Sequence, residues 1–183
     1  MVTEPAQKIK MATDEEWVAD LWHDRQQTRE VHEVLADVGF FEALTDEELR
    51  QVGPIMHTRS FVPHETIVRQ GAPGVGMYII LSGSADVQLE TADGNTIHLA
   101  TLGEQQFFGE MSLLDGAARA ASVVAVERTD TLGFFRPDLM GLIDHSPQLG
   151  SKIVWKVTEI MAGRLTETLG DYRQVMQQLR SLE

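Results

Sequence analysis

The stretch FFGEMSLLDGAARAASV, residues 107–123, is the most informative part of this chain. A Gly-Glu step precedes its short apolar segment, and a lone arginine, Arg119, follows among small residues. A phosphodiester needs a planar cationic donor with free backbone N–H groups nearby, and Arg119 beside Ala120 and Ala121 can present both. Glu110 can accept a hydrogen bond from a sugar hydroxyl. The stretch therefore predicts a small anion-binding pocket.

Simpler interpretations of the same residues stay open at this point. An arginine between small residues is often a solvated or salt-bridged surface group, and Glu110 would then pair with Arg119 across an empty pocket. The hydroxyl of Ser122 either contacts a ligand or lies at the start of a strand.

Short runs of β-branched and apolar residues, separated by turn residues, fill the sequence from Phe61 to Phe135. Such runs predict strands, and they cover residues 66–68, 78–81, 85–89, 97–99, 121–126 and 131–135. The Asp93-Gly94 step predicts a hairpin between the third and fourth runs. Many short strands that close on themselves are typical of a sandwich or a jelly roll, so the fold class is mainly β.

Two helices are predicted before the strands. Thr13 and Glu16 match a capping box at the start of an amphipathic helix that Gly39 would end. Its apolar stripe, which is typical of packing against a surface, consists of Trp17, Leu21, Thr28, Val31, Leu35 and Val38. A second Thr-x-x-Glu pattern at Thr45 opens a short helix before a Gly-Pro step.

A short helix from Arg136 and a long final helix are predicted after the strands. Ser146 and Pro147 supply the N-cap and first helical residue of the long helix, which runs nearly to the end of the chain. A persistent apolar stripe on it consists of Ile153, Val157, Ile160, Met161, Leu165, Leu169, Tyr172, Met176 and Leu179. Because no other sequence covers this stripe, a second copy of the chain is the natural partner, which predicts a homodimer. Gly163 and Gly170 either permit close helix approach or are tolerated surface glycines.

Composition limits the classes of function. The 183 residues carry 28 acidic and 15 basic side chains, and the formal net charge of −13 would repel nucleic acid and anionic membranes. The chain has no cysteine, and its 6 histidines lack metal-ligand spacing, so no metal is expected. No nucleophile with a base appears, so we expect no catalytic residue and no enzyme. Without a leader or membrane-span pattern, the sequence predicts a cytoplasmic protein.

Three motifs in the right order resemble the cyclic nucleotide-binding domain family, which includes catabolite activator protein, the regulatory subunit of protein kinase A and cyclic-nucleotide-gated channels. FGEMSLLDGAARAASV is similar to the family's phosphate-binding cassette. The segments 65–71, ETIVRQG, and 78–83, YIILSG, are similar to its strand-turn signature and its glycine-ended strand. The resemblance covers roughly residues 40–145. His64 departs from it, because the family usually has a turn glycine there.

The resemblance implies a β jelly roll, or double-stranded β-helix, with an N-terminal helix pair and a long C-terminal helix, and with terminal helices that move on ligand binding. It implies that the backbone of Gly109 approaches the ribose, that Glu110 accepts from the ribose 2′-hydroxyl, and that Arg119 pairs with the cyclic phosphate. Ala120 and Ala121 would contribute backbone N–H groups. The N-terminus of the short helix that contains Leu113 would contribute a favourable dipole. The candidate ligand-binding residues are Phe108, Gly109, Glu110, Met111, Ser112, Arg119, Ala120, Ala121 and Ser122.

The same resemblance implies three segments and a preferred ligand. Residues 1–39 form an N-terminal helical segment, 40–145 the cyclic nucleotide-binding jelly roll, and 146–183 the long helix that would dimerise. Members that prefer cGMP often place a threonine where this chain has Ala120, whereas cAMP binders of the kinase-regulatory type have alanine. A missing hydroxyl cannot reward guanine, so cAMP is favoured by roughly tenfold if one hydrogen bond of about 1.4 kcal/mol is at stake.

The leading hypothesis is a cAMP-responsive regulatory protein of signal transduction that turns ligand binding into movement of its terminal helices. Two alternatives belong to other classes. One is a structural dimerisation module whose degenerate pocket holds no cyclic nucleotide. The other is the regulatory part of a transcription factor like catabolite activator protein, without the DNA-binding domain, because no helix-turn-helix follows the long helix before Glu183.

Overall fold

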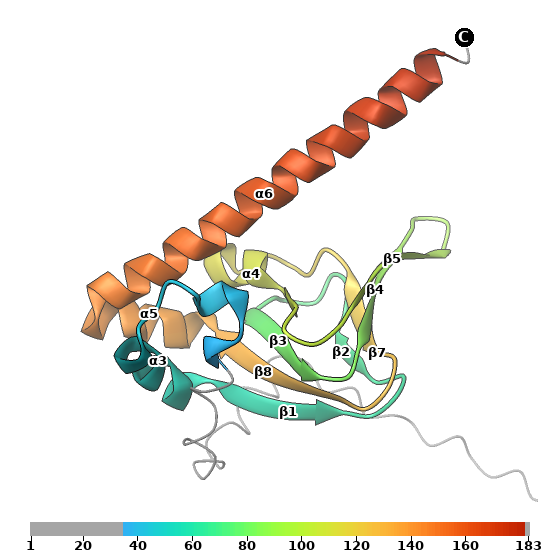
Figure 1. The fold of residues 1–183 in the computed structure, drawn as a ribbon. Helices are drawn as coiled ribbons and strands as arrows, with labels where there is room; N and C mark the ends of the chain where they lie inside the picture. Colours follow the sequence, from blue (N-terminus) through green and yellow to red (C-terminus); the bar gives the residue numbers. More distant parts are fainter. Residues whose placement is uncertain (1–34, 182–183) are drawn as a thin grey trace, which may run out of the picture.

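The computed structural model describes residues 35–181, which form two four-stranded antiparallel sheets with helices gathered at one end (Figure 1). The strand orders are β1-β8-β3-β6 and β2-β7-β4-β5. The strands are β1 His57–Phe61, β2 Thr66–Val68, β3 Gly76–Ser82, β4 Ala85–Glu90, β5 Thr96–Leu102, β6 Phe107–Phe108, β7 Ser122–Ala125 and β8 Thr129–Phe135. The helices are η1 Gly39–Phe41, α3 Asp46–Val52, η2 Gly53–Ile55, α4 Glu110–Asp115, α5 Arg136–His145 and α6 Pro147–Arg180.

Strand β3 is buried on both of its faces because alternate side chains enter two different cores. Tyr78 and Ile80 lie in the core between the two sheets, with Phe61, Val123 and Phe135. Met77 and Ile79 lie in the core beneath the helices, with Leu35, Val38, Phe40, Leu139, Leu149 and Ile153. Successive side chains of a strand point to opposite faces, so one strand connects the sandwich to the helical layer.

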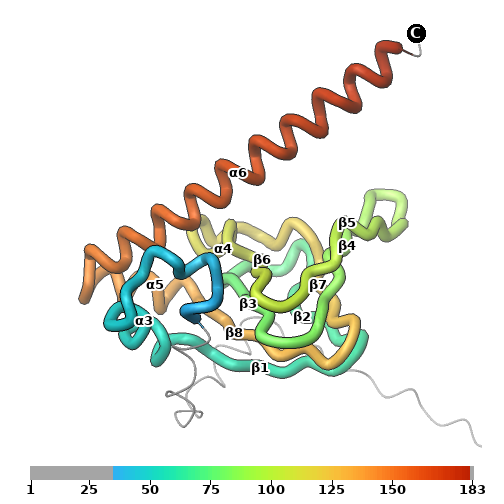
Figure 2. The backbone as a smooth tube through the Cα atoms, in the orientation of Figure 1, coloured from blue at the N-terminus to red at the C-terminus, as the bar shows by residue number. Residues whose placement is uncertain are grey.

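The strands follow the predicted sequence runs closely. All six predicted runs are strands, and the Asp93-Gly94 turn connects β4 to β5 as an antiparallel hairpin. Sequence analysis missed β1, which pairs with β8, and the two-residue β6, which pairs with β3 (Figure 2). The architecture of two sheets with flanking helices is the predicted jelly roll.

Of the helix caps predicted from the sequence, the cap at the start of α3 is confirmed and the side-chain cap at the start of α6 is wrong. Thr45 and Glu48 form the predicted capping box at the start of α3. Pro147 is the first residue of α6, but the hydroxyl of Ser146 does not cap that helix and donates instead to Gln51. The helix predicted from Thr13 lies mostly outside the described residues, although Leu35 and Val38 of its stripe are buried in the core.

The long helix α6 packs on its own domain over its first turns and leaves it afterwards (Figure 1). Leu149, Ile153 and Val157 are buried, and ion pairs join Lys152 to Glu48 and Lys156 to Glu42. The expectation that the whole stripe needs a second copy is therefore wrong for its first half, which the helical core covers. Every described residue after Arg164 on this helix is exposed.

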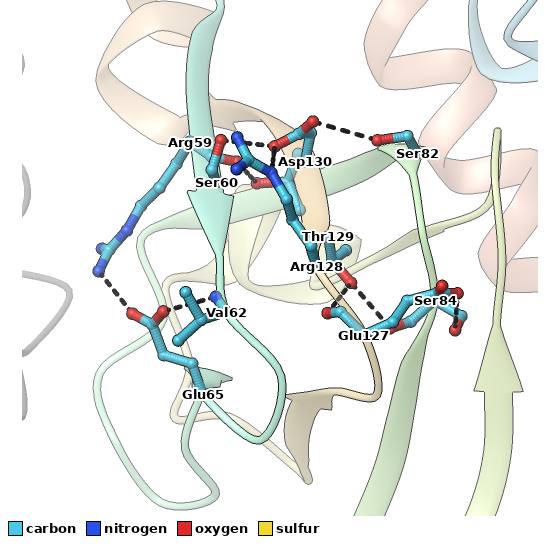
Figure 3. Close-up of polar contacts among 11 residues, drawn as sticks. Arg59, Ser60, Val62, Glu65, Ser82, Ser84, Glu127, Arg128, Thr129 and Asp130 are labelled. Atoms are coloured by element: carbon cyan, nitrogen blue, oxygen red, sulfur yellow. Dashed lines mark hydrogen bonds and ion pairs between the residues drawn. The ribbon is translucent and has the colours of Figure 1, made fainter.

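Polar side chains fasten the strands together at the end of the sandwich that lies away from the helices (Figure 3). Asp130 of β8 accepts hydrogen bonds from Ser60 of β1 and Ser82 of β3, so one carboxylate connects three neighbouring strands. The loop between β1 and β2 holds His64 with φ +68°, a left-handed conformation that favours glycine. His64 therefore adopts the backbone conformation that the family's usual glycine would adopt at this position, and the turn keeps its shape.

Within residues 35–181, no helix is both long enough and apolar enough to cross a membrane.

The ion pair between Lys152 and Glu48 makes the docking of α6 depend on pH. The pKa of Glu48 lies below its ordinary value, chiefly because of its hydrogen bond with Lys152 and then because of the Thr45 backbone N–H. A carboxyl with a lowered pKa adds stability that is full above the ordinary value of 4.5 and is lost as the pH falls through the lower folded value.

We therefore expect Lys152→Gln to lower the free energy of unfolding by about 0.5 kcal/mol at neutral pH, the scale of a surface pair. The difference should shrink as the pH falls below 4.5 and vanish once Glu48 is protonated in the folded protein. Urea titrations of both proteins at several pH values measure it, with Arg173→Gln as a control that removes a charge farther along α6. A cost that does not change with pH would show that Lys152 acts through packing of its alkyl stem.

Candidate functional site

The candidate site is built around the turn from β6 into α4. Gly109 stands between them with φ +83° and ψ 11°, the left-handed conformation that residues other than glycine rarely adopt. This turn brings Glu110 to the first position of the short helix, which ends at Gly116 in a second left-handed conformation with φ +66°. The predicted little helix is thus confirmed, with both of its ends set by glycine.

Close packing around position 109 also requires a glycine there. A Cβ at this position would lie 2.3 Å from Nη1 of Arg119 and 2.8 Å from the carbonyl oxygen of Gly76. Both distances are shorter than any ordinary contact, so a side chain would push the arginine away from β3. The absent side chain at Gly109 therefore allows the guanidinium to lie against the backbone.

Arg119 is buried, with 4% of its surface exposed. Its Nη1 donates to the carbonyl of Gly76 at 2.6 Å and approaches the carbonyl of Gly109 at 3.5 Å. Its guanidinium carbon lies 5.7 Å from the ring centroid of Tyr78, within the range of a cation–π contact. The interpretation of Arg119 as a solvated surface group is therefore wrong.

The Arg119 backbone is fixed as well as its side chain. Its N–H donates to Ala72, and its carbonyl accepts from Gly71, at 2.9 and 2.8 Å. The loop between β2 and β3 therefore sets where the arginine leaves the chain, while β3 sets where its guanidinium ends.

Glu110 is equally buried, with 3% of its surface exposed, and its carboxylate pairs with Arg164 of α6. Nη2 of Arg164 also donates to the carbonyl of Phe107 at 3.3 Å, and the guanidinium carbon lies 5.3 Å from the Phe107 ring centroid. The open interpretation in which Glu110 pairs with Arg119 gives way to a pair with the C-terminal helix. Sequence analysis missed Arg164, because it lies 54 positions away and within no recognised motif.

The other predicted site residues divide into buried supports and exposed rim positions. Phe108 is buried and stacks on Tyr78, with ring centroids 5.4 Å apart. The Ser112 hydroxyl donates to the carbonyl of Ala117 at 3.2 Å, which closes the loop after α4. Met111 is 50% exposed.

The three predicted site residues that follow Arg119 differ in exposure and in contacts. Ala120 is exposed and Ala121 half-buried. Ser122 is the first residue of β7, and its hydroxyl accepts from the backbone N–H of Gln70 at 2.9 Å. Its interpretation as the start of a strand is confirmed. Among the residues that the structure describes, no group of three or more His, Asp or Glu side chains is placed to hold a metal ion.

Comparison with known proteins fits this geometry. The family model described as "Cyclic nucleotide-binding domain" matches residues 58–146, which include the cassette and all of the two sheets except His57. Residues 58–146 therefore match the cyclic nucleotide-binding domain family. The chain is 35% identical over 127 residues to the cyclic AMP receptor protein of Thermus thermophilus, covering 69% of this chain and 57% of that one.

Solved structures of cyclic nucleotide-binding domains share this fold. A domain from Methylobacillus flagellatus has a TM-score of 0.68 and 27% identity, over 78% of this chain and 80% of that one. The regulatory subunit of a cAMP-independent protein kinase A from Trypanosoma brucei has a TM-score of 0.64 and 26% identity, over 80% and 50%. The chain thus spans less than two thirds of the Thermus and Trypanosoma proteins.

The close contact between Gly109 and Arg119 predicts that a side chain at position 109 lowers the stability of the domain. We expect Gly109→Ala to lower the free energy of unfolding by roughly 3 kcal/mol, from a strained left-handed residue plus the displaced arginine. Gly94→Ala is the matched control, because Gly94 has φ +81° with nothing within 4 Å of an added Cβ. It should cost about 1 kcal/mol, the backbone strain alone. Equal losses in urea unfolding would show that Arg119 yields without cost.

Proposed function

We propose that this chain is a regulatory cyclic nucleotide sensor that prefers cAMP and converts its binding into movement of the terminal helices. One observation carries the proposal: the cassette presents a buried arginine and a buried carboxylate on the two sides of Gly109, and that carboxylate is joined to α6. Arg119 binds the cyclic phosphate through its planar donors, and Glu110 accepts from the ribose 2′-hydroxyl. Phe108 and Ser112 support the turn from within, and Met111 lies exposed at its rim.

The preference for cAMP has narrower support. Ala120 offers no hydroxyl to the guanine amino group, and the name of the Thermus relative refers to cyclic AMP. The Trypanosoma relative is named as part of a cAMP-independent kinase, so the fold alone does not select the ligand. A pocket that does not respond to cAMP is consistent with that name, and the second candidate function is a structural dimerisation module whose pocket takes no cyclic nucleotide.

Titration calorimetry of nucleotide-stripped protein separates the two functions. We expect saturable cAMP binding, with cGMP bound roughly tenfold more weakly. Arg119→Ala should lower the affinity for cAMP by at least about a hundredfold, because charged hydrogen bonds to the phosphate are lost. Absence of heat with either nucleotide, in a protein that still dimerises, would favour the structural module.

Two further variants make the Arg119 result interpretable. Arg119→Lys keeps the charge but loses the planar fork, and it should bind cAMP more weakly than the wild type and more tightly than Arg119→Ala. Arg128→Ala removes an arginine whose side chain is 77% exposed, and it should leave the affinity unchanged. Circular dichroism of each variant shows whether it is folded.

The second half of α6 supports the homodimer in this proposal. Its exposed stripe, which we call the distal stripe, consists of Leu165, Leu169, Tyr172, Met176 and Leu179, between 36% and 61% exposed. The steps along it are four, three, four and three residues, the spacing at which two helices wind around each other. Residues 146–183 thus carry the dimer contact and 40–145 the nucleotide site.

Leu169→Glu should convert the dimer to a monomer, because it places a charge in the middle of the distal stripe. Gln174→Glu, an exposed position outside the stripe, is the matched control and should leave the dimer intact. Sedimentation equilibrium measures the mass of each. A Leu169→Glu protein that remains a dimer would place the contact on another surface.

A further inference from the structure

We propose that Gln70 is a positioning residue for the nucleotide site, because its side chain takes the place of a strand that stops short at the cassette. This inference rests on the proposed function. Gln70 itself contacts no part of the ligand. It holds the end of β4, so that Ala120 and Ala121 stay outside the sheet and keep their backbone N–H groups for the cyclic phosphate.

The sheet has a gap between β2 and β4 beside the cassette. Strand β7 lies between these two strands, and its pairing with β4 ends at Ser122 opposite Gln88. Continued for two more residues, the same antiparallel register would place Ala120 opposite Glu90. Because β7 begins only at Ser122, the end of β4 has β5 as its one strand neighbour among the described residues.

The side-chain amide of Gln70 fills this gap. Its Nε2 donates to the carbonyl of Glu90 at 3.0 Å, and its Oε1 accepts from the N–H of the same residue at 2.7 Å. The N–H and the C=O of one strand residue exchange hydrogen bonds with a single partner in an antiparallel ladder. The amide offers one donor and one acceptor, so it satisfies Glu90 as Ala120 would have done.

The backbone around Gln70 is tied to the same junction. The N–H of Gln70 donates at 2.9 Å to the hydroxyl of Ser122, the first residue of β7. The N–H of the next residue, Gly71, donates to the carbonyl of Arg119 at 2.8 Å. Gln70 and Gly71 therefore join the end of β4, the start of β7 and the backbone of the arginine.

Ala120 and Ala121 remain outside every strand as a result. Within residues 35–181, neither of their N–H groups donates to another backbone group. An N–H group that enters a ladder is no longer available to a ligand, whereas these two are. Without the Gln70 amide, the backbone of Glu90 is left to water or to Ala120, and pairing with Ala120 would cost the phosphate a donor.

Calorimetry of the wild type, Gln70→Met and Gln88→Met tests this role. Methionine keeps the length of the side chain and removes both hydrogen bonds to Glu90. Gln70→Met should bind cAMP roughly tenfold more weakly, the effect of losing one hydrogen bond to a charged group. Gln88→Met makes the same substitution two residues earlier on β4, where the side chain has no hydrogen bond within the described residues, and it should match the wild type.

Nuclear magnetic resonance separates positioning from a general loss of stability. An amide proton moves downfield when it donates to a phosphate oxygen. Saturation with cAMP should move the Ala120 and Ala121 amide protons downfield in the wild type and in Gln88→Met, and less so in Gln70→Met. The amide of Glu90 should exchange with solvent faster in Gln70→Met, with and without ligand. Equal downfield shifts in all three proteins would overturn the positioning role.

The affinities distinguish a failure of this inference from a failure of the sensor. Saturable cAMP binding by the wild type with equal binding by Gln70→Met keeps the sensor and overturns the role of Gln70. An equal loss in Gln70→Met and Gln88→Met assigns the effect to β4 in general and overturns that role as well. Absence of binding by all three folded proteins overturns the sensor, and the inference with it.

Discussion

The hydrogen bond from Arg119 to the carbonyl of Gly76 joins the cassette to the strand on which both cores depend. Strand β3 contributes alternate side chains to the sandwich and to the helical layer, so its position is fixed from two sides. The hydrogen bond to this strand therefore fixes the position of the Arg119 guanidinium. The contact is possible because Gly109 lacks a side chain, since an added Cβ there would collide with the Arg119 guanidinium and with the Gly76 carbonyl oxygen. The absent side chain of Gly76 serves a different contact, the close approach of β3 to the backbone of β8. The cationic group of the site is thus positioned by a core strand rather than by the surface loop that carries it.

The long helix divides into parts with different physical roles. Leu149, Ile153 and Val157 belong to the core beneath the sheets, so the start of α6 cannot move without unpacking the domain. Around Arg164 the attachment is polar, with the carboxylate of Glu110 buried and the arginine side chain half exposed. Beyond it, the exposed apolar side chains favour association with another surface. A buried apolar segment, a polar attachment and an exposed apolar stripe therefore follow one another along a single helix.

The sequence predicted the parts of this structure in which local pattern and packing agree. Runs such as Tyr78 to Leu81 are strands because β-branched and aromatic side chains suit a doubly buried position, and Thr45 caps α3 because its partner lies three residues away. Strand β1, HTRSF, was missed because its outer residues are polar and only Phe61 is fully buried. Arg119 and Glu110 were found because they lie nine residues apart in one motif. Arg164 was not, because a contact across 54 positions leaves no local pattern.

Charge explains how so acidic a chain can hold an anion. The formal net charge of −13 is spread over the surface, where salt screens interactions beyond about 8 Å at physiological ionic strength. The site itself contains Arg119, Glu110 and Arg164, two positive groups and one negative, so the field that a phosphate meets is set locally. Arg164 also neutralises Glu110, whose carboxylate would otherwise be a buried charge without compensation.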